Sequence, residues 1–249
     1  MDINKMLILR IVLMSYALLT LSFNVISQNS DKNISPDIFE IIAQVNNVYG
    51  VNDELVNGIV YPIPDSKIKG NPFLLDAWAP TALYINNNTF HNFYVNYDLI
   101  IDNIVLKIEL ANGIERLIDL NKFQIDSFRL ANGFFINSLV LNKDKPSPTF
   151  LERIYKGDYS LYMKYEKVFI RKYNNTSPFG KYSSVRKDIY LFYNNELYNV
   201  TRKSTFLSHF EKSKQSDIKK FMKRNHIRYR KALKSDLMEL MKYCDILTQ

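Results

Sequence analysis

Short hydrophobic segments separated by turn-forming residues run through the middle of the chain, from Gly58 to about Val200. The segments are rich in β-branched and aromatic side chains, and turn residues recur about every 8 to 12 positions. Asparagine and glycine, which tolerate the positive φ angles of tight turns, occupy residues 86–88, 112–113, 132–133 and 194–195. This pattern predicts a meander of antiparallel strands. No helical pattern of about ten residues intervenes, so a parallel sheet with crossover helices is disfavoured.

The predicted strands cover residues 82–85, 90–95, 103–109, 114–120, 122–130, 134–141, 151–155, 159–165, 188–193 and 196–200. Two polar stretches interrupt them. Residues 142–148 contain two prolines and either separate two lobes or form a long hairpin loop. Residues 171–184 contain two adjacent asparagines and a glycine, which predicts an exposed, mobile loop.

Helical spacing occurs near both ends of the chain. Ser35, Pro36 and Asp37 supply an N-cap, a first-turn proline and a first-turn acid, and isoleucines follow at helical spacing, so a short helix is predicted at about residues 36–45. Residues 201–249 are predicted to form three helices. Their starts are marked by Ser204, by Ser216-Asp217 and by Ser235-Asp236. The last helix carries an apolar stripe made by Leu237, Leu240, Met241, Cys244 and Leu247.

Together these elements predict a mainly β chain. Residues 28–200 are expected to form an antiparallel meander, arranged as a sandwich or barrel-like domain with a short N-terminal helix. Residues 201–249 are expected to form a basic helical subdomain that packs its apolar stripes on the sheet. A barrel embedded in an outer membrane would need regular alternation over strands of about ten residues, which residues 103–109 do not keep.

The first 27 residues have the order of a secretory signal peptide. Lys5 and Arg10 give a positive start, residues 11–23 are apolar, and small residues precede an expected cut before Gln28. A retained membrane anchor is the alternative, although only about 16 residues are predominantly apolar and a spanning helix needs roughly 20. Lipid attachment at the cut is excluded because no cysteine stands there. The chain is therefore expected to be exported, which disfavours nucleotide-dependent chemistry.

The composition is that of a chain with a sizeable core. Hydrophobic residues make up 47% and aromatic residues 14%, so the chain can bury enough apolar surface to fold without disulfide staples. Cys244 is the only cysteine, and no intramolecular disulfide can form. Its place in an apolar stripe predicts a buried, inert thiol.

The excess of positive charge lies in the C-terminal segment. Residues 201–249 hold 13 Lys and Arg against 5 Asp and Glu, whereas residues 28–200 hold 18 basic against 19 acidic residues. Four of these basic residues are candidates for docking to an anionic membrane surface or to an envelope protein, namely Lys219, Lys220, Lys223 and Arg224. The alternative is that the helices leave these side chains in solvent. Nucleic-acid binding is disfavoured by export.

No motif for catalysis or cofactor binding is present in the sequence. The three histidines form no metal-type pair, and there is no glycine-rich phosphate loop and no Gly-x-Ser-x-Gly elbow, so no cofactor and no metal are expected. Carboxylates recur at Asp98, Asp102, Asp119 and Asp126, near predicted strand ends, where aspartate commonly accepts backbone hydrogen bonds. Two carboxylates roughly 5 to 9.5 Å apart could hydrolyse a glycosidic bond, but spacing along strands does not establish that separation.

Several short segments, spread along most of the mature chain, carry a sequence resemblance to known proteins. They are Gly-Ile-Val-Tyr-Pro at 58–62, Gly-Asn-Pro-Phe at 70–73, Trp78, Tyr-Asp-Leu at 97–99, Asp-Ser-Phe at 126–128, and residues 190–200 and 219–225. In these segments the chain resembles a group of uncharacterised exported proteins of the Bacteroidota. The resemblance implies a Gram-negative envelope setting, and it brings no known activity and no catalytic residue.

We therefore expect an exported protein, periplasmic or outer-membrane-associated, that acts as a non-enzymatic binding or structural module of the cell envelope. A glycan- or lipid-directed hydrolase with an unrecognised site is the alternative. A deep pocket that gathers two carboxylates would favour the hydrolase, and a featureless sheet surface would favour binding.

Overall fold

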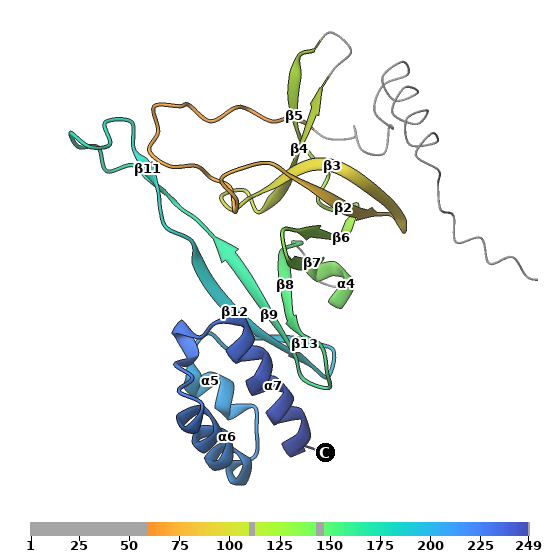
Figure 1. Cartoon of the computed structure of the whole chain (residues 1–249), viewed down its shortest axis with the longest axis vertical. Helices are drawn as coiled ribbons and strands as arrows, with labels where there is room; N and C mark the ends of the chain where they lie inside the picture. The colour runs from red at the N-terminus through yellow and green to blue at the C-terminus, as the bar shows by residue number, and fades with distance from the viewer. Residues whose placement is uncertain (1–58, 110–112, 143–146, 249) are drawn as a thin grey trace, which may run out of the picture. The chain divides into compact units, whose positions relative to one another are not determined.

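The computed structural model describes residues 59–109, 113–142 and 147–248 (Figure 1). The described residues all belong to one compact unit, Asn46–Gln249. The predicted export signal, its cleavage site and the predicted helix at residues 36–45 lie outside the described residues.

Strands make up most of the regular structure. They are β1 (Ile59–Val60), β2 (Ala79–Ile85), β3 (Asn88–Asp98), β4 (Asn103–Glu109), β5 (Glu115–Asp119), β6 (Ile125–Leu130), β7 (Gly133–Asn137), β8 (Phe150–Tyr155), β9 (Ser160–Glu166), β10 (Phe169–Ile170), β11 (Lys181–Tyr182), β12 (Arg186–Tyr193) and β13 (Glu196–Asn199). The helices are α4 (Ser138–Leu141), α5 (Lys203–Ser208), α6 (Lys212–Arg224) and α7 (Lys234–Thr248), with a 3-10 turn at Tyr229–Lys231.

One antiparallel sheet contains all of these strands except β10 and β11, which pair with each other. Its order is β1-β5-β4-β3-β2-β6-β7-β8-β9-β12-β13. The prediction of a mainly antiparallel β fold with a C-terminal helical part is therefore confirmed. The edge strands β1 and β13 do not pair with each other, so the sheet is open.

The sheet curls in the region of β2 to β5. The strands β5 and β6 follow each other in the chain but are four steps apart in the sheet, because β4, β3 and β2 lie between them. In a flat sheet those steps would separate the two strands by about 19 Å. The connecting residues 120–124 include a turn in which the Gln124 N–H donates to the Asn121 carbonyl at 3.0 Å, so they cannot span that distance. The sheet therefore folds over in this region.

Asparagine turns close the hairpins as the sequence predicts. Asn86 and Asn87 connect β2 to β3 with φ angles of 49° and 65°, and Asn194 and Asn195 connect β12 to β13 with 51° and 60°. Two consecutive positive φ angles are the geometry whose twist matches that of an antiparallel pair.

Around residues 134–148 one expectation is corrected and one open alternative is decided. The strand predicted over 134–141 ends at Asn137, because the Asn137 side chain accepts the N–H of Leu139 at 3.0 Å and caps the short helix α4. Residues 142–148 do not separate two lobes, since β7 and β8 on either side of them pair with each other. They belong to the hairpin that joins these two strands.

The C-terminal helices bury their apolar residues and leave their charges outside. The helix α6 begins at Lys212, ahead of the predicted start at Ser216, and buries Ile218 and Met222. In α7 the predicted stripe is buried through Leu237, Leu240, Met241 and Cys244. These side chains join the sheet residues in one continuous core cluster. Figure 1 shows α5, α6 and α7 grouped beside β9, β12 and β13.

Cys244 is fully buried, as predicted, and burial raises the pKa of its thiol to about 12. With one cysteine in the chain, no intramolecular disulfide is possible. Within the described ranges, no helix has the length and apolar character needed to cross a membrane.

Candidate ligand pocket and polar cluster at the β3–β4 turn

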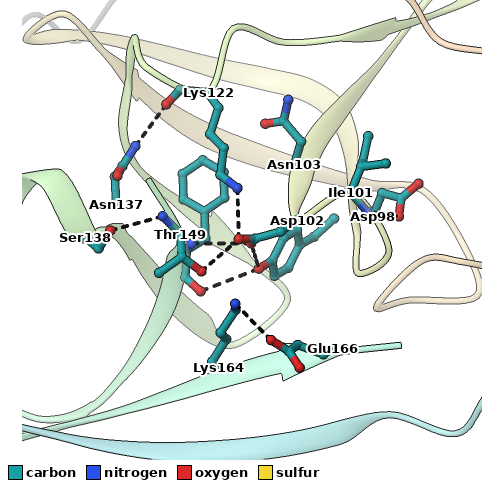
Figure 2. Close-up of polar contacts among 12 residues, drawn as sticks. Asp98, Ile101, Asp102, Asn103, Lys122, Asn137, Ser138, Thr149, Lys164 and Glu166 are labelled. Carbon is teal, nitrogen blue, oxygen red and sulfur yellow. Dashed lines mark hydrogen bonds and ion pairs between the residues drawn. The ribbon is translucent and has the colours of Figure 1, made fainter. Parts of the chain in front are cut away.

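A four-residue turn joins β3 to β4 and directs two carboxylates to different sides. Asp98 ends β3, and its Oδ1 accepts the N–H groups of Ile100 at 2.7 Å and Ile101 at 3.3 Å. Asp102 closes the turn with a φ of 54°, a left-handed conformation that aspartate tolerates better than most residues. Figure 2 shows Asp102 directed at Lys122, and Asp98 directed away from that cluster.

The Asp102 carboxylate accepts from four donors. They are the Tyr97 hydroxyl, the Thr149 hydroxyl at 2.7 Å, the Phe150 N–H at 3.4 Å and the Lys122 ammonium at 2.8 Å (Figure 2). A carboxylate offers about four lone-pair sites. All of them are occupied, so Asp102 retains no acceptor for a substrate.

The cluster around Asp102 is therefore structural. It ties the β3–β4 turn to the start of β8 and, through Lys122, to the connection between β5 and β6. Burial, followed by the charge of Asp102, raises the pKa of Tyr97 well above its usual value and keeps its hydroxyl a donor. The ion pair between Lys164 and Glu166 on β9 is also drawn in Figure 2; its 2.8 Å contact lowers the pKa of Glu166.

A pocket of about 530 Å³ lies on the other side of the turn, where Asp98 points. Its walls come from the segment between β1 and β2, the β3–β4 turn, the end of β5 and the β10–β11 pair. The apolar lining consists of Pro62, Ile63, Pro64, Ile68, Pro72, Ile100 and Ile101. Three aromatic rings, Tyr61, Phe169 and Tyr182, and two carboxylates, Asp98 and Asp119, complete it.

Backbone hydrogen bonds hold the walls in place. The Tyr61 N–H donates to Leu117 at 2.9 Å and continues the pairing of β1 with β5, and the Tyr182 N–H donates to Lys69 at 3.0 Å. Figure 1 shows the β1–β2 segment running from β5 out to β11 and back to β2. The prolines of this segment have fixed φ angles and no N–H group, so they give a stiff and apolar wall.

Asp98 lines the pocket and is buried, with 2% of its surface exposed. Besides the two N–H groups of its own turn, it accepts the Tyr61 hydroxyl on Oδ2 at 2.5 Å. Burial and the neighbouring Asp98 carboxylate raise the pKa of Tyr61 far above its ordinary value, so this hydroxyl stays protonated and donates. Asp98 therefore has three of its acceptor sites filled by the protein.

Asp119 accepts fewer hydrogen bonds from the protein than Asp98 does. Its Oδ1 accepts the side-chain amide of Asn103 at 2.5 Å, and no residue in the described part of the chain donates to Oδ2. Burial raises the pKa of Asp119 above its usual value, and the negative charge of Asp98 acts in the same direction, although the Asn103 hydrogen bond and the positive charge of Lys122 oppose them. The second oxygen of Asp119 is thus available to a ligand.

The four carboxylates singled out in the sequence lie in three different environments. Asp98 and Asp119 meet in the pocket, Asp102 is saturated in the polar cluster, and Asp126 accepts the N–H of Asn87 at 3.1 Å in the β2–β3 hairpin. The pocket itself was not predicted from the sequence. Its only sequence signal was the group of prolines between residues 62 and 72, which marks a stiff, irregular segment.

The four basic residues predicted as a docking surface lie together on α6. Lys219, Lys220, Lys223 and Arg224 are all exposed, and Lys220 pairs with Asp217 at 3.0 Å. The apolar side of α6 is buried in the core, so these residues form a charged surface without an accompanying free apolar stripe. They lie on a different element from the pocket.

Comparisons of the chain with protein-family models, with curated proteins and with solved structures found no match.

Proposed function

We propose that this chain is an exported envelope protein that binds a small, largely apolar ligand in the pocket beside the β3–β4 turn. The observation that carries the proposal is the pocket itself. Its volume of about 530 Å³ lies within the range of known small-molecule sites, which are mostly apolar with a few convergent polar groups.

The exposed rim of the pocket supports this proposal. Ile63 is 78% exposed, and Ile100 and Ile101 are 38% and 46% exposed. Exposed apolar side chains around a pocket are typical of a place where a ligand or partner binds. Backbone hydrogen bonds already hold the pocket walls in place, so we expect binding to cost little conformational entropy.

The test is titration of the protein with a neutral fluorescent apolar probe such as Nile red. Changing Ile101→Asp places a charge in the apolar wall, and we expect the affinity for the probe to fall at least about tenfold, the effect of about 1.4 kcal/mol. Ile246→Asp is the matched control, because Ile246 is 72% exposed on α7 and outside the pocket lining. Equal affinities of the two variants would contradict the proposed site.

A hydrolase is the second candidate function, and one observation favours it. Asp98 and Asp119 line the same pocket, and burial raises the pKa of Asp119, the direction required of a general acid. We rank it below binding because Asp98 already accepts three hydrogen bonds from the protein. Hydrolysis in a panel of glycosides and esters that Asp119→Asn abolishes would reverse this ranking.

Export to the periplasm or the outer membrane is part of the proposal. Its test is cell fractionation followed by N-terminal sequencing, with a mature N-terminus at Gln28 as the expected result. An intact Met1 terminus would instead support a retained anchor.

A further inference from the structure

The charged and aromatic groups of the pocket are unevenly distributed. Two carboxylates and three aromatic rings line it, and none of the lining residues is basic. Two ammonium groups outside the lining, Lys122 and Lys167, feel the charge of these carboxylates, and both have partners of their own. Lys167 donates to the carbonyls of Asn71 at 2.9 Å and Phe73 at 2.6 Å, and Lys122 is paired with Asp102. Negative charge in the pocket is therefore left without a counter-charge from the lining.

We expect such a lining to bind ligands with different affinities according to the charge of their head groups. An ammonium group gains from the carboxylates and from the electron-rich faces of the aromatic rings, whereas an anionic head group would face repulsion in an apolar surrounding. A neutral alcohol would use the walls and could donate one hydrogen bond to Oδ2 of Asp119, but it brings no positive charge to pair with the carboxylates. Tyr182 offers a further polar atom, because no described residue bonds to its hydroxyl.

We infer that the pocket takes a primary alkylammonium ligand, with the ammonium group donating to Oδ2 of Asp119 and the alkyl chain lying against the isoleucine and proline wall. The inference rests on the proposed binding function and names the class of ligand. Phe169 and Tyr182, whose ring centroids are 5.6 Å apart, provide aromatic surface in the same lining.

A metal ion fits the same lining less well. Calcium takes six to eight oxygen ligands, and Asp98 and Asp119 together already accept four hydrogen bonds from the protein. A hydrated ion would also gain nothing from the apolar wall. A quaternary ammonium lacks the N–H that Oδ2 of Asp119 requires.

The experiment compares three ligands of equal chain length that differ only in the head group. Decylamine, decanol and decanoate are titrated into the protein, purified in its exported form, by calorimetry at pH 7. At this pH the amine and the carboxylate carry opposite charges. We expect decylamine to bind most tightly, decanol at least about tenfold more weakly, and decanoate most weakly of the three.

Two variants locate the head group. Asp119→Asn keeps an amide oxygen for Asn103 and removes the charge, so we expect decylamine to bind about tenfold more weakly while decanol is unaffected. Asp158→Asn makes the same change of charge at an exposed residue outside the pocket lining, and both ligands should bind it as they bind the unaltered protein.

The outcomes separate the two proposals. If decanol binds but decylamine is no tighter, or if Asp119→Asn leaves decylamine unaffected, the inference about the ligand fails while the binding pocket stands. If decyltrimethylammonium binds as tightly as decylamine, the assignment of a hydrogen-bonded primary amine is wrong. If neither decanol nor Nile red binds, the proposed function fails as well.

Discussion

His209 is a single side chain that links the pH of the surroundings to the stability of the fold. It follows α5, its ring lies 4.7 Å from that of Tyr198, and its Nδ1 shares a hydrogen bond of 3.1 Å with the Tyr193 hydroxyl. Burial lowers the pKa of His209 below its ordinary value of 6.5. The folded chain therefore favours the neutral ring.

We predict that the protein loses stability as the pH falls from 7 to 5. A group whose pKa is lower in the folded state stabilises the fold above its unfolded pKa, and that contribution is lost as the pH falls below it. His209→Gln should reduce the shift of the thermal midpoint between these pH values. His91→Gln, at an exposed position of β3, is the matched control and should keep the full shift. An identical shift in both variants would contradict the role of His209.

Asp119 acts on stability with the opposite sign. Because burial raises its pKa in the folded state, its contribution is complete below the unfolded pKa and is lost as the pH rises through the folded pKa. Ionised Asp119 in this apolar pocket therefore lowers the free energy of unfolding at neutral pH.

At the scale of elements, α6 carries the four exposed basic residues that the sequence predicts as a docking surface. We predict that changing Lys219, Lys220, Lys223 and Arg224 together to Glu lowers binding to vesicles that contain anionic lipid, measured by co-sedimentation at low salt. Four basic residues near a membrane contribute about 1 kcal/mol each, so at least a tenfold loss is expected. The effect should shrink at high salt because these charges are exposed.

The matched control changes the same amount of charge away from α6. It replaces four other exposed basic residues by Glu, namely Arg116, Lys156, Arg171 and Lys172. If both variants lose vesicle binding equally, net charge and not α6 is responsible. If neither does, α6 is no membrane-docking surface, and capture of an envelope protein that depends on α6 would identify the other predicted partner.

The elements were predictable to the extent that local chemistry determines them. Strand β4 matches its predicted limits of 103–109, and the Asn86-Asn87 turn has the positive φ angles that asparagine favours. The prediction was wrong where a side chain intervened, as when Asn137 ended β7 by capping α4. The pocket depends on which distant segments meet, here Asp98 with Asp119 and Phe169, and local patterns carry no such information.

At the scale of the whole described unit, polar contacts join the helices to the sheet. The Glu152 carboxylate on β8, 3% exposed, accepts from the Tyr165 hydroxyl and from Lys234 at the start of α7. Asp245 on α7 accepts the Tyr155 hydroxyl at 2.9 Å. A Cβ atom at Gly157 would lie 1.8 Å from the Asp245 carboxylate, so glycine is required for α7 to approach this closely.

These contacts, together with the continuous core, predict that helices and sheet unfold as one cooperative unit. Leu240→Ala removes a fully buried side chain of α7 and should cost about 2 to 5 kcal/mol. Trp78, the only tryptophan, reports from the β1–β2 segment, and among the described elements α6 and α7 contribute most of the helical circular dichroism. We expect both melting curves to coincide and to shift down together.

Ile246→Ala is the control for this prediction, because Ile246 lies on the same helix with 72% of its surface exposed, and its melting curves should hardly move. If Leu240→Ala lowered the helical transition and left the Trp78 transition in place, the helical segment would be a separate folding unit. The coincidence of the two curves matters for function, because the pocket lies on the curled β1–β5 side of the sheet. A cooperative unit would let damage in α7 weaken ligand binding there without any contact to the ligand.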